Sequence, residues 1–416
     1  MTKPALENIV EVPGSKSISN RALICAALAT SSSSVKNCAP GDDTEAMIAA
    51  LRSLDVEVRK TELELEISGN LNLESSNHVT LDAKLAGTTS RFLTALAALR
   101  RGTTTVDGGE SLRGRPMGEL HDALIAIGAS VETPNGLGHL PVTVSRGAPR
   151  AAAIALGAEV SSQYASALMM IGPYLPTGLE ISLVGHVVSR GYIEMTVGVM
   201  RAFGAQVDFS DNHIWVAPGR YAGTRYQVEP DASSASYPLA ARAISSGEVT
   251  IKDLSRASLQ GDVAFVDVLA SMGCQVSQTA TGIRLRREKP VPLGGVAVDM
   301  SQISDCVPTL AAVALFAATP TEITGVGFIR DKESDRIGEL ATELRKLGAN
   351  VHETRDGLRI EPVSLTGAKL ATHHDHRLAM AFALIQREVP NIVIDDPTVV
   401  AKSWPRYFDA LPNFYR

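Results

Sequence analysis

The sequence predicts an α/β protein built of six repeated units, with apolar helices buried inside and β-sheets outside. Two observations predict this fold class: a helix–strand phrase that recurs at a near-constant interval, and a second series of Ala-rich helices between its copies. The period of about 70 residues is longer than the roughly 20–50 residues of a thin solenoid repeat, so the units are expected to form compact layers. Helices that are apolar on every side, such as LAAVALFA, belong in an interior.

The first series is a phrase that reads LRSLDVEV in its first copy and LRKLGANV in its last. Its copies are 73, 76, 69 and 75 residues apart and end at Val58, Val131, Val207, Val276 and Val351. Each copy predicts an amphipathic helix that is stopped by Gly, or by Asp55 in the first copy, and is followed by a short strand. A second strand signal follows each copy, as in LELEIS and GIRLRR.

The second series consists of six apolar helices that each open with a short polar cluster, from SKSISNRALICAALA to HHDHRLAMAFALI. Their markers are 71, 73, 72, 72 and 70 residues apart: Ser17, Thr88, Ser161, Ser233, Asp305 and Asp375. The sixth unit lacks its closing strand, and the strand NIVEVPG could complete it, which would place residues 1–14 with the C-terminal half. The alternative is two ordinary α/β domains with accidental similarity, which the near-equal steps disfavour.

Composition limits the function classes. A length of 416 residues suits two or three domains of about 150 residues. The formal net charge is 39 − 45 = −6, without the positive excess of a nucleic-acid-binding protein. The opening MTKPALENIV has no apolar signal-peptide region, and no stretch approaches ~18 uninterrupted apolar residues, so we expect neither secretion nor a membrane span. The four cysteines show no CxxC pair, so we expect no zinc knuckle or disulfide framework, and a reducing cytosol fits best.

The starts of the six apolar helices are candidate anion sites, because a helix N-terminus presents unpaired N–H groups and a partial positive charge. If the units are equivalent, these starts converge in two groups of three. Ser17 and Arg21 are four residues apart and share one helix face, where a hydroxyl and a guanidinium suit a phosphate or carboxylate. Other basic residues lie at helix starts or on loops: Lys16, Arg91, Arg113, Arg115, Lys332, Arg336, Arg377 and Lys402. Together they predict a cleft for a small, multiply anionic ligand.

Competing motifs are incomplete. PGSKS lacks the Gly before Lys16 that a Walker A loop needs, and GVGFIR has Arg330 where a dinucleotide fingerprint needs its third Gly. The His373–His376 run could bind a metal, but no Cys or EXXH partner lies nearby and an Asp-capped helix start explains it. Cys306 has no nearby His in the sequence, so we expect a core residue rather than a nucleophile.

An ordered set of motifs extends over essentially the whole chain: VPGSKSISNRAL, AGTTSRF, RGRPM, SSQYASAL, SRGYI, SDCVPTLAAVALFA, KESDRIGELATELRKLGA, DHRLAMAFAL and AKSWPRYFDAL. This set resembles the 3-phosphoshikimate 1-carboxyvinyltransferase (EPSP synthase) family. The resemblance implies an inside-out α/β barrel fold of two similar domains, each with three βαβαββ-type units, and an active site in the cleft between them. It implies that residues 15–227 bind mainly shikimate 3-phosphate, and that residues 1–14 with 228–416 contribute the phosphoenolpyruvate site.

The implied reaction transfers the carboxyvinyl group of phosphoenolpyruvate to the 5-hydroxyl of shikimate 3-phosphate and releases phosphate. The resemblance also implies that no metal or organic cofactor is required. We therefore expect a cytoplasmic, monomeric enzyme of aromatic amino-acid biosynthesis whose partners are these two small molecules.

The resemblance also assigns residues to each substrate. The shikimate 3-phosphate set is Lys16, Ser17, Arg21, Ser161, Ser162, Gln163, Ser189, Tyr192, Asp305 and Lys332. The phosphoenolpyruvate set is Lys16, Gly87, Arg115, Gln163, Arg336, Arg377 and Lys402. His376 falls at a site position without a defined role.

The implied chemistry needs a base near the attacking hydroxyl and an acid that protonates the methylene carbon. Asp305 is the candidate base, Glu333 the candidate acid and Lys16 a third candidate. Arg and Lys side chains would stabilise the departing phosphate.

Three positions depart from the family pattern: Leu85 and Phe328 stand where many members have Asn, and Phe92 where part of the family has Pro. Two other functions stay open. One is the sister enolpyruvyl transferase that acts on UDP-N-acetylglucosamine, which the SKSxSNR and SSQ motifs disfavour. The other is a catalytically inactive anion-binding protein on the same fold.

Overall fold

The structure is a computed structural model that describes residues 8–61, 64–134, 136, 138–150, 153–157, 162–185, 187 and 189–416. The chain divides into two compact units. The N-terminal unit comprises residues 14–228, and the C-terminal unit comprises residues 1–13 together with 229–416. These boundaries lie one residue from those that the repeats and the resemblance imply.

The N-terminal unit contains three four-stranded sheets among its described residues, all with the same strand order. Their strands, in spatial order, are β13 (Arg225–Gln227), β2 (Ser33–Lys36), β4 (Glu64–Ile67) and β3 (Val58–Lys60); β5 (Val79–Asp82), β6 (Thr104–Asp107), β8 (Val142–Ser145) and β7 (Ser130–Glu132); and β9 (Ala153–Gly157), β10 (Leu179–Val184), β12 (His213–Val216) and β11 (Val207–Ser210).

The C-terminal unit repeats this order in two of its sheets and shortens it in the third. Their strands are β1 (Ile9–Val10), β14 (Gly247–Lys252), β16 (Gly282–Arg287) and β15 (Gln275–Gln278); β17 (Ala297–Asp299), β18 (Thr321–Thr324), β20 (Leu358–Glu361) and β19 (Asn350–Glu353); and β21 (Lys369–Leu370) with β22 (Val393–Ile394). In every sheet the first pair of strands is parallel. The predicted βαβαββ unit is therefore confirmed.

The N-terminal strand β1 corrects one expectation. We expected residues 8–14 to complete the sixth unit, whereas Ile9 and Val10 pair with Thr250 and Ile251 of β14 in the fourth. In the same way, β13 precedes the fourth helix in the chain but pairs with β2 of the first unit. The first and fourth repeats have thus exchanged edge strands. This follows from the path of the chain, which crosses from one compact unit to the other after β1 and crosses back after β13. Hydrophobic spacing sets the number of strands but not which sheet an edge strand joins.

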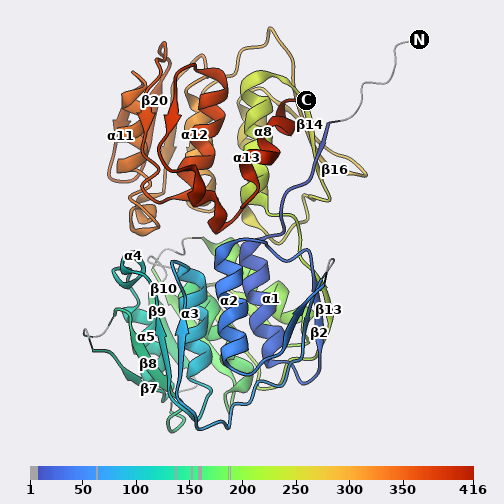
Figure 1. The fold of residues 1–416 in the computed structure, drawn as a ribbon, viewed down its shortest axis with the longest axis vertical. Helices are drawn as coiled ribbons and strands as arrows, with labels where there is room; N and C mark the ends of the chain where they lie inside the picture. Colours follow the sequence, from blue (N-terminus) through green and yellow to red (C-terminus); the bar gives the residue numbers. More distant parts are fainter. Residues whose placement is uncertain are drawn as a thin grey trace. The chain divides into compact units, whose positions relative to one another are not determined.

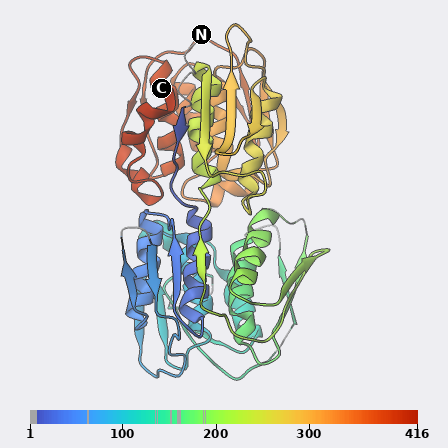
Figure 2. The same ribbon diagram turned by 90° about the vertical axis from the view of Figure 1, so that its right-hand side faces the viewer.

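The six Ala-rich helices are buried, as predicted. In each unit of Figures 1 and 2 they lie inside, and the strands lie outside. They are α1 (Lys16–Leu28), α3 (Gly87–Ala97), α6 (Ser162–Ile171), α8 (Ala232–Ser245), α10 (Val307–Ala314) and α12 (His376–Glu388). Every residue of α10 is buried, which agrees with its apolar character on all sides.

The amphipathic helices also follow the predicted repeat. They are α2 (Asp42–Ser53), α5 (Gly118–Ala126), α7 (Arg190–Ala202), α9 (Phe265–Ser271) and α11 (Gly338–Lys346). The stop residue after each has a left-handed backbone, with φ of 104° at Gly128, 86° at Gly204, 107° at Gly273 and 81° at Gly348, and 63° at Asp55. Asp tolerates this conformation better than most side chains, so the aspartate of the first copy replaces the usual glycine.

Short helices complete the described elements. They are α4 (Glu110–Arg113), α13 (Tyr407–Ala410) and the 3₁₀ helices η1 (Gly172–Tyr174), η2 (Gly261–Ala264), η3 (Ser304–Cys306), η4 (Gly327–Asp331), η5 (Pro397–Lys402) and η6 (Leu411–Tyr415). Within the residues that the structure describes, no helix combines the length and apolar character needed to cross a membrane.

The polar helix starts act as caps. The Ser15 hydroxyl accepts a hydrogen bond from Ile18 N–H in α1, and the Asp231 carboxylate accepts one of 2.6 Å from Ser234 N–H in α8. The Asp375 carboxylate accepts one of 2.8 Å from Arg377 N–H in α12. These caps use side-chain oxygens at the helix starts that the spacing had marked.

Candidate active site

Arg21 is the central cation of the N-terminal unit. Its side chain on α1 is buried and donates hydrogen bonds to Thr196 Oγ1 at 2.7 Å, Ser17 O at 2.9 Å and Ser166 Oγ at 3.0 Å. It also donates one of 3.3 Å to Tyr192 O, and its guanidinium lies 5.2 Å from the centre of the Phe92 ring. All of these partners are neutral.

No carboxylate pairs with Arg21 among the described residues. Burial lowers the pKa of Arg21 to about 10, against weaker opposing effects from Tyr192 and Cys25. A desolvated cation with only neutral partners is costly, and an anionic ligand would compensate it. The structure thus places Ser17, Arg21 and Tyr192 of the predicted set together, by contacts through Ser17 O and Tyr192 O.

A second group of predicted residues surrounds the start of α3. A Cβ added at Gly87 would lie 2.6 Å from Arg115 Nη1 and 2.7 Å from Arg91 Nη1, so glycine allows both guanidinium groups to approach the backbone. Arg91 donates a hydrogen bond of 2.8 Å to Gln163 Oε1 on α6. Two guanidinium groups at a helix N-terminus form a favourable anion site. Sequence reasoning noted Arg91 as a basic helix start without assigning it to a substrate.

The remaining predicted residues of this unit lie on the starts of their helices. Lys16 begins α1, and its Nζ is 2.9 Å from Asp43 Oδ2, with both side chains largely buried. Ser162 is buried at the start of α6, while Ser161 lies outside the described residues. Ser189 is buried and precedes α7 with φ 55° and ψ 40°. A left-handed conformation is uncommon for serine.

Arg336 is the centre of the predicted site in the C-terminal unit. Its buried guanidinium donates hydrogen bonds to Asp375 Oδ2 at 2.7 Å, Glu333 Oε2 at 2.7 Å and Asp305 Oδ1 at 2.9 Å. We call these four residues the Arg336 cluster. Burial alone lowers the pKa of Arg336, but the three carboxylates outweigh it and raise the pKa above its ordinary value.

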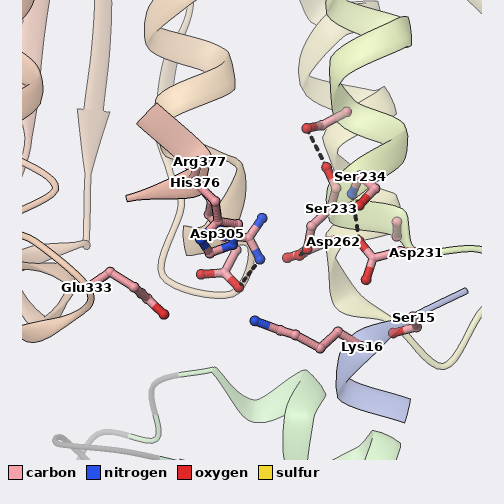
Figure 3. Close-up of polar contacts among 12 residues, drawn as sticks. Ser15, Lys16, Asp231, Ser233, Ser234, Asp262, Asp305, Glu333, His376 and Arg377 are labelled. Carbon is pink, nitrogen blue, oxygen red and sulfur yellow. Dashed lines mark hydrogen bonds and ion pairs between the residues drawn. The ribbon is translucent and has the colours of Figure 1, made fainter. Parts of the chain in front are cut away.

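Asp305 joins this cluster to α12. It lies in η3, and its Oδ2 accepts a hydrogen bond of 2.6 Å from Arg377 Nη2 (Figure 3). Burial alone raises the pKa of Asp305, but Arg377, Lys332 and Arg336 hold that pKa well below its ordinary range. The carboxylate is therefore ionised at neutral pH and is a weak base in this arrangement.

Glu333 is the second candidate acid–base group, and it contacts two cations. Arg336 holds one oxygen, and Lys402 Nζ lies 3.4 Å from the other. Lys332, the preceding residue, places its ammonium 6.0 Å from the centre of the Phe328 ring. Four predicted cations, Lys332, Arg336, Arg377 and Lys402, thus surround two predicted carboxylates.

The comparisons with known proteins identify the family. A family model described as EPSP synthase (3-phosphoshikimate 1-carboxyvinyltransferase) matches residues 1–411. This chain belongs to the EPSP synthase family. A relative named 3-phosphoshikimate 1-carboxyvinyltransferase from Nostoc punctiforme is 41% identical over 403 residues, which cover 96% of this chain and 94% of the relative. One of the same name from a Nostoc species is 40% identical over the same shares.

A solved EPSP synthase structure from Acinetobacter baumannii supports the same assignment. It is 26% identical to this chain, with a TM-score of 0.81 over 97% of this chain and 94% of the other. The predicted resemblance and the predicted fold class are thereby confirmed.

The three departures from the family pattern have distinct surroundings. Phe92 is buried under the Arg21 guanidinium, and the Phe328 ring faces the Lys332 ammonium, so both aromatic rings make cation–π contacts with predicted substrate residues. Leu85 is 46% exposed before α3. Phe92 and Phe328, two of the three residues that depart from the family pattern, therefore each contact the side chain of a predicted substrate-binding cation.

Sequence reasoning missed two carboxylates of this candidate site. Asp375 is fully buried and both caps α12 and pairs with Arg336, whereas the sequence marked it only as a cap. Asp43 pairs with Lys16 and was not singled out. The available signal was their position, since each opens a helix near a predicted cation, as in DHR and GDD.

The His373–His376 run has a structural role in the described contacts. His373 lies 2.9 Å from Glu339 Oε2 and 2.8 Å from Glu343 Oε1 on α11, which ties the loop before α12 to that helix. His376 is buried next to Asp375, with 3.7 Å between Nδ1 and Oδ1. Cys306 is fully buried, as predicted, and burial raises the pKa of its thiol.

Proposed function

We propose that this chain transfers the carboxyvinyl group of phosphoenolpyruvate to the 5-hydroxyl of shikimate 3-phosphate, giving 5-enolpyruvylshikimate 3-phosphate and phosphate. The observation that carries the proposal is that a family model of this enzyme matches residues 1–411. The Arg21 site, which is Arg21 with Ser17, Ser166, Tyr192 and Thr196, and the Arg336 cluster both support it, because both substrates carry a phosphate and a carboxylate.

The N-terminal unit would bind mainly shikimate 3-phosphate. Arg21 supplies a buried cation whose described hydrogen-bond partners are all neutral. The hydroxyl and amide groups that accompany it suit phosphate and hydroxyl oxygens. The proposed set in this unit is Lys16, Ser17, Arg21, Ser161, Ser162, Gln163, Ser189 and Tyr192, and Lys332 and Asp305 of the other unit complete it.

Phosphoenolpyruvate would bind to cations of both units. Arg336 and Arg377 now pair with carboxylates of the chain, so an anionic substrate must compete for them. In the N-terminal unit, the absence of a side chain at Gly87 lets the guanidinium groups of Arg115 and Arg91 approach the backbone. The proposed set is Lys16, Gly87, Arg115, Gln163, Arg336, Arg377 and Lys402.

Asp305 would act as the base and Glu333 as the acid, with Lys16 as an alternative proton carrier. The substrate hydroxyl oxygen bonds to C2 of the enol while its proton passes to the base, and the acid adds a proton to the methylene carbon. The tetrahedral intermediate then breaks its C–O bond to phosphate, and nearby Arg and Lys groups stabilise the departing charge. If the substrate draws Arg336 and Arg377 away from Asp305, the pKa of Asp305 rises and its base strength increases.

Phosphate release tests the proposal. The protein is mixed with phosphoenolpyruvate and either shikimate 3-phosphate or UDP-N-acetylglucosamine. We expect release with shikimate 3-phosphate alone. Release only with UDP-N-acetylglucosamine would assign the sister activity, and release with neither would favour an inactive anion-binding protein.

We also propose a cytoplasmic monomer. The support for the cytoplasmic location is that all four cysteines are free thiols, three of them buried, which suits a reducing compartment. Size-exclusion chromatography with light scattering measures the mass. A value near the chain mass of 44.0 kDa is expected, and a dimer mass would refute the monomer.

A further inference from the structure

Asp262 is a buried carboxyl group that the proposed mechanism does not use. It lies in η2, before α9, and is 5% exposed. One oxygen, Oδ2, accepts a hydrogen bond from the Ser233 hydroxyl of α8. The other, Oδ1, is buried and has no hydrogen-bond partner within the described part of the chain. An ionised carboxylate with one unsatisfied oxygen is costly in such a place, whereas a protonated one is tolerated.

The segment that carries Asp262 is firmly attached to the start of α8. The Gln260 side chain accepts a hydrogen bond of 2.9 Å from Ala232 N–H and donates one of 2.7 Å to Pro230 O. Together with the Ser233 contact, these bonds fix the position of the Asp262 carboxyl. The carboxyl of Asp262 is therefore held beside the start of α8.

Charged groups of η3, α8 and α12 face Asp262. Figure 3 shows its carboxyl on the α8 side of the Asp305–Arg377 pair. Burial and the negative charge of Asp305 raise the pKa of Asp262 to about 7, against the Ser233 hydrogen bond and Arg377, and Asp231 adds to the rise. Cys306 lies in the same core, with a thiol that stays protonated.

The two carboxyl groups, Asp262 and Asp305, thus differ in how readily they bind a proton. Asp305 is ionised and strongly held by arginines, which makes it a weak base. Asp262 gains or loses its proton near neutrality, where a proton-transfer enzyme operates. Because like charges close together raise each other's proton affinity, a negative charge on Asp262 adds to the base strength of Asp305.

We propose that Asp262 is a positioning residue whose ionisation activates Asp305 as the base of the reaction. This inference rests on the proposed function. With Asp262 protonated, Asp305 stays a weak base; when Asp262 releases its proton to water, the second negative charge strengthens Asp305, which then accepts the proton of the attacking hydroxyl. Asp262 does not touch the substrate.

The test compares the pH dependence of turnover in the wild-type protein and in Asp262→Asn, which keeps the shape but never ionises. Phosphate release is measured at saturating substrates from about pH 5.5 to 9. We expect similar rates at the acid end and a wild-type rate that exceeds the variant roughly 3- to 10-fold at the alkaline end, as about one unit of base strength gives. Substrate phosphate groups ionise in both proteins, so the ratio of the two rates is the readout.

Two further variants complete the experiment. Asp267→Asn removes an exposed carboxylate of α9 that pairs with Arg256, and we expect the wild-type pH profile. Ser233→Ala removes the hydrogen bond that lowers the pKa of Asp262, so the inflection should move to higher pH. This second shift keeps the inference testable if Asp262→Asn folds poorly.

The possible outcomes distinguish failure of the role of Asp262 from failure of the proposed function. An unchanged inflection in Asp262→Asn, an equal loss at every pH, or an unmoved inflection in Ser233→Ala would each overturn the role of Asp262. Absence of phosphate release by the wild-type protein at every pH would instead refute the proposed function.

Discussion

The Arg21 site and the Arg336 cluster each have a fully buried guanidinium at their centre, with opposite surroundings. Arg21 meets hydroxyl and carbonyl groups, and burial lowers its pKa to about 10. Arg336 meets three carboxylates, which raise its pKa. The difference shows two ways in which a buried arginine can be held before an anion binds. Arg21 has no carboxylate among its described contacts, whereas Arg336 is paired with three carboxylates and would have to exchange partners to bind an anion.

This contrast also bears on the two carboxylates that we propose as base and acid, Asp305 and Glu333, which both belong to the Arg336 cluster. A carboxylate that is released when its arginine turns to a substrate becomes a stronger base at the moment of reaction. The Arg21 site contains no carboxylate among its described contacts and is suited to binding alone.

The largest expected effect is that of Asp305→Asn on turnover. Loss of the base should lower kcat by about 10²- to 10⁴-fold. Phosphoenolpyruvate binding should be no weaker than in the wild-type protein, because Arg336 and Arg377 lose a competing carboxylate. Rapid-quench assays measure kcat and equilibrium titration measures binding. Unchanged turnover would remove Asp305 from the mechanism.

Substitution of each arginine by methionine tests the contrast directly. Arg336→Met leaves Asp305, Glu333 and Asp375 together without their shared cation and should lower the free energy of unfolding by about 3–5 kcal/mol. Arg21→Met removes a desolvated cation with neutral partners and should cost much less. Urea unfolding monitored by circular dichroism measures both. Equal losses would contradict the assigned difference between the two sites.

Arg21→Ala should weaken shikimate 3-phosphate binding by roughly 10- to 100-fold, the loss of charge-assisted hydrogen bonds. Binding of phosphoenolpyruvate should change little. Calorimetric titration with each substrate measures both constants. An equal loss for the two substrates would refute the subsite assignment.

The last prediction concerns how the stability of the fold depends on pH. The pKa of Asp262 is about 7 in the folded chain and 3.8 ordinarily, so the folded state binds more protons between these values and stability falls as pH rises through this window. Asp262→Asn removes this decline, so its melting temperature relative to the wild-type protein should increase from pH 4 to pH 7 and then level off. Differential scanning calorimetry at a series of pH values measures the shift. A constant difference would mean that Asp262 titrates alike in both states.

Much of the fold could be predicted because the repeated sequence patterns reflect local requirements of helices and strands. Apolar runs such as LAAVALFA require burial wherever they lie, and Gly128, Gly204, Gly273 and Gly348 mark left-handed helix ends. The exchange of β1 and β13 could not be predicted, because both are parallel edge strands of only two and three residues, too short to specify a partner. Their partners depend on where the chain passes between units.

The sequence alone determined the repeating unit, the buried helices and the types of residue at their starts, since these follow from spacing and side-chain chemistry. Only the tertiary structure decided which charges meet. Asp375 reaches Arg336 across 39 positions, and Arg21 reaches Thr196 across 175. The protonation state of Asp262 depends on the same long-range packing, because burial and facing charges, not sequence neighbours, set its pKa.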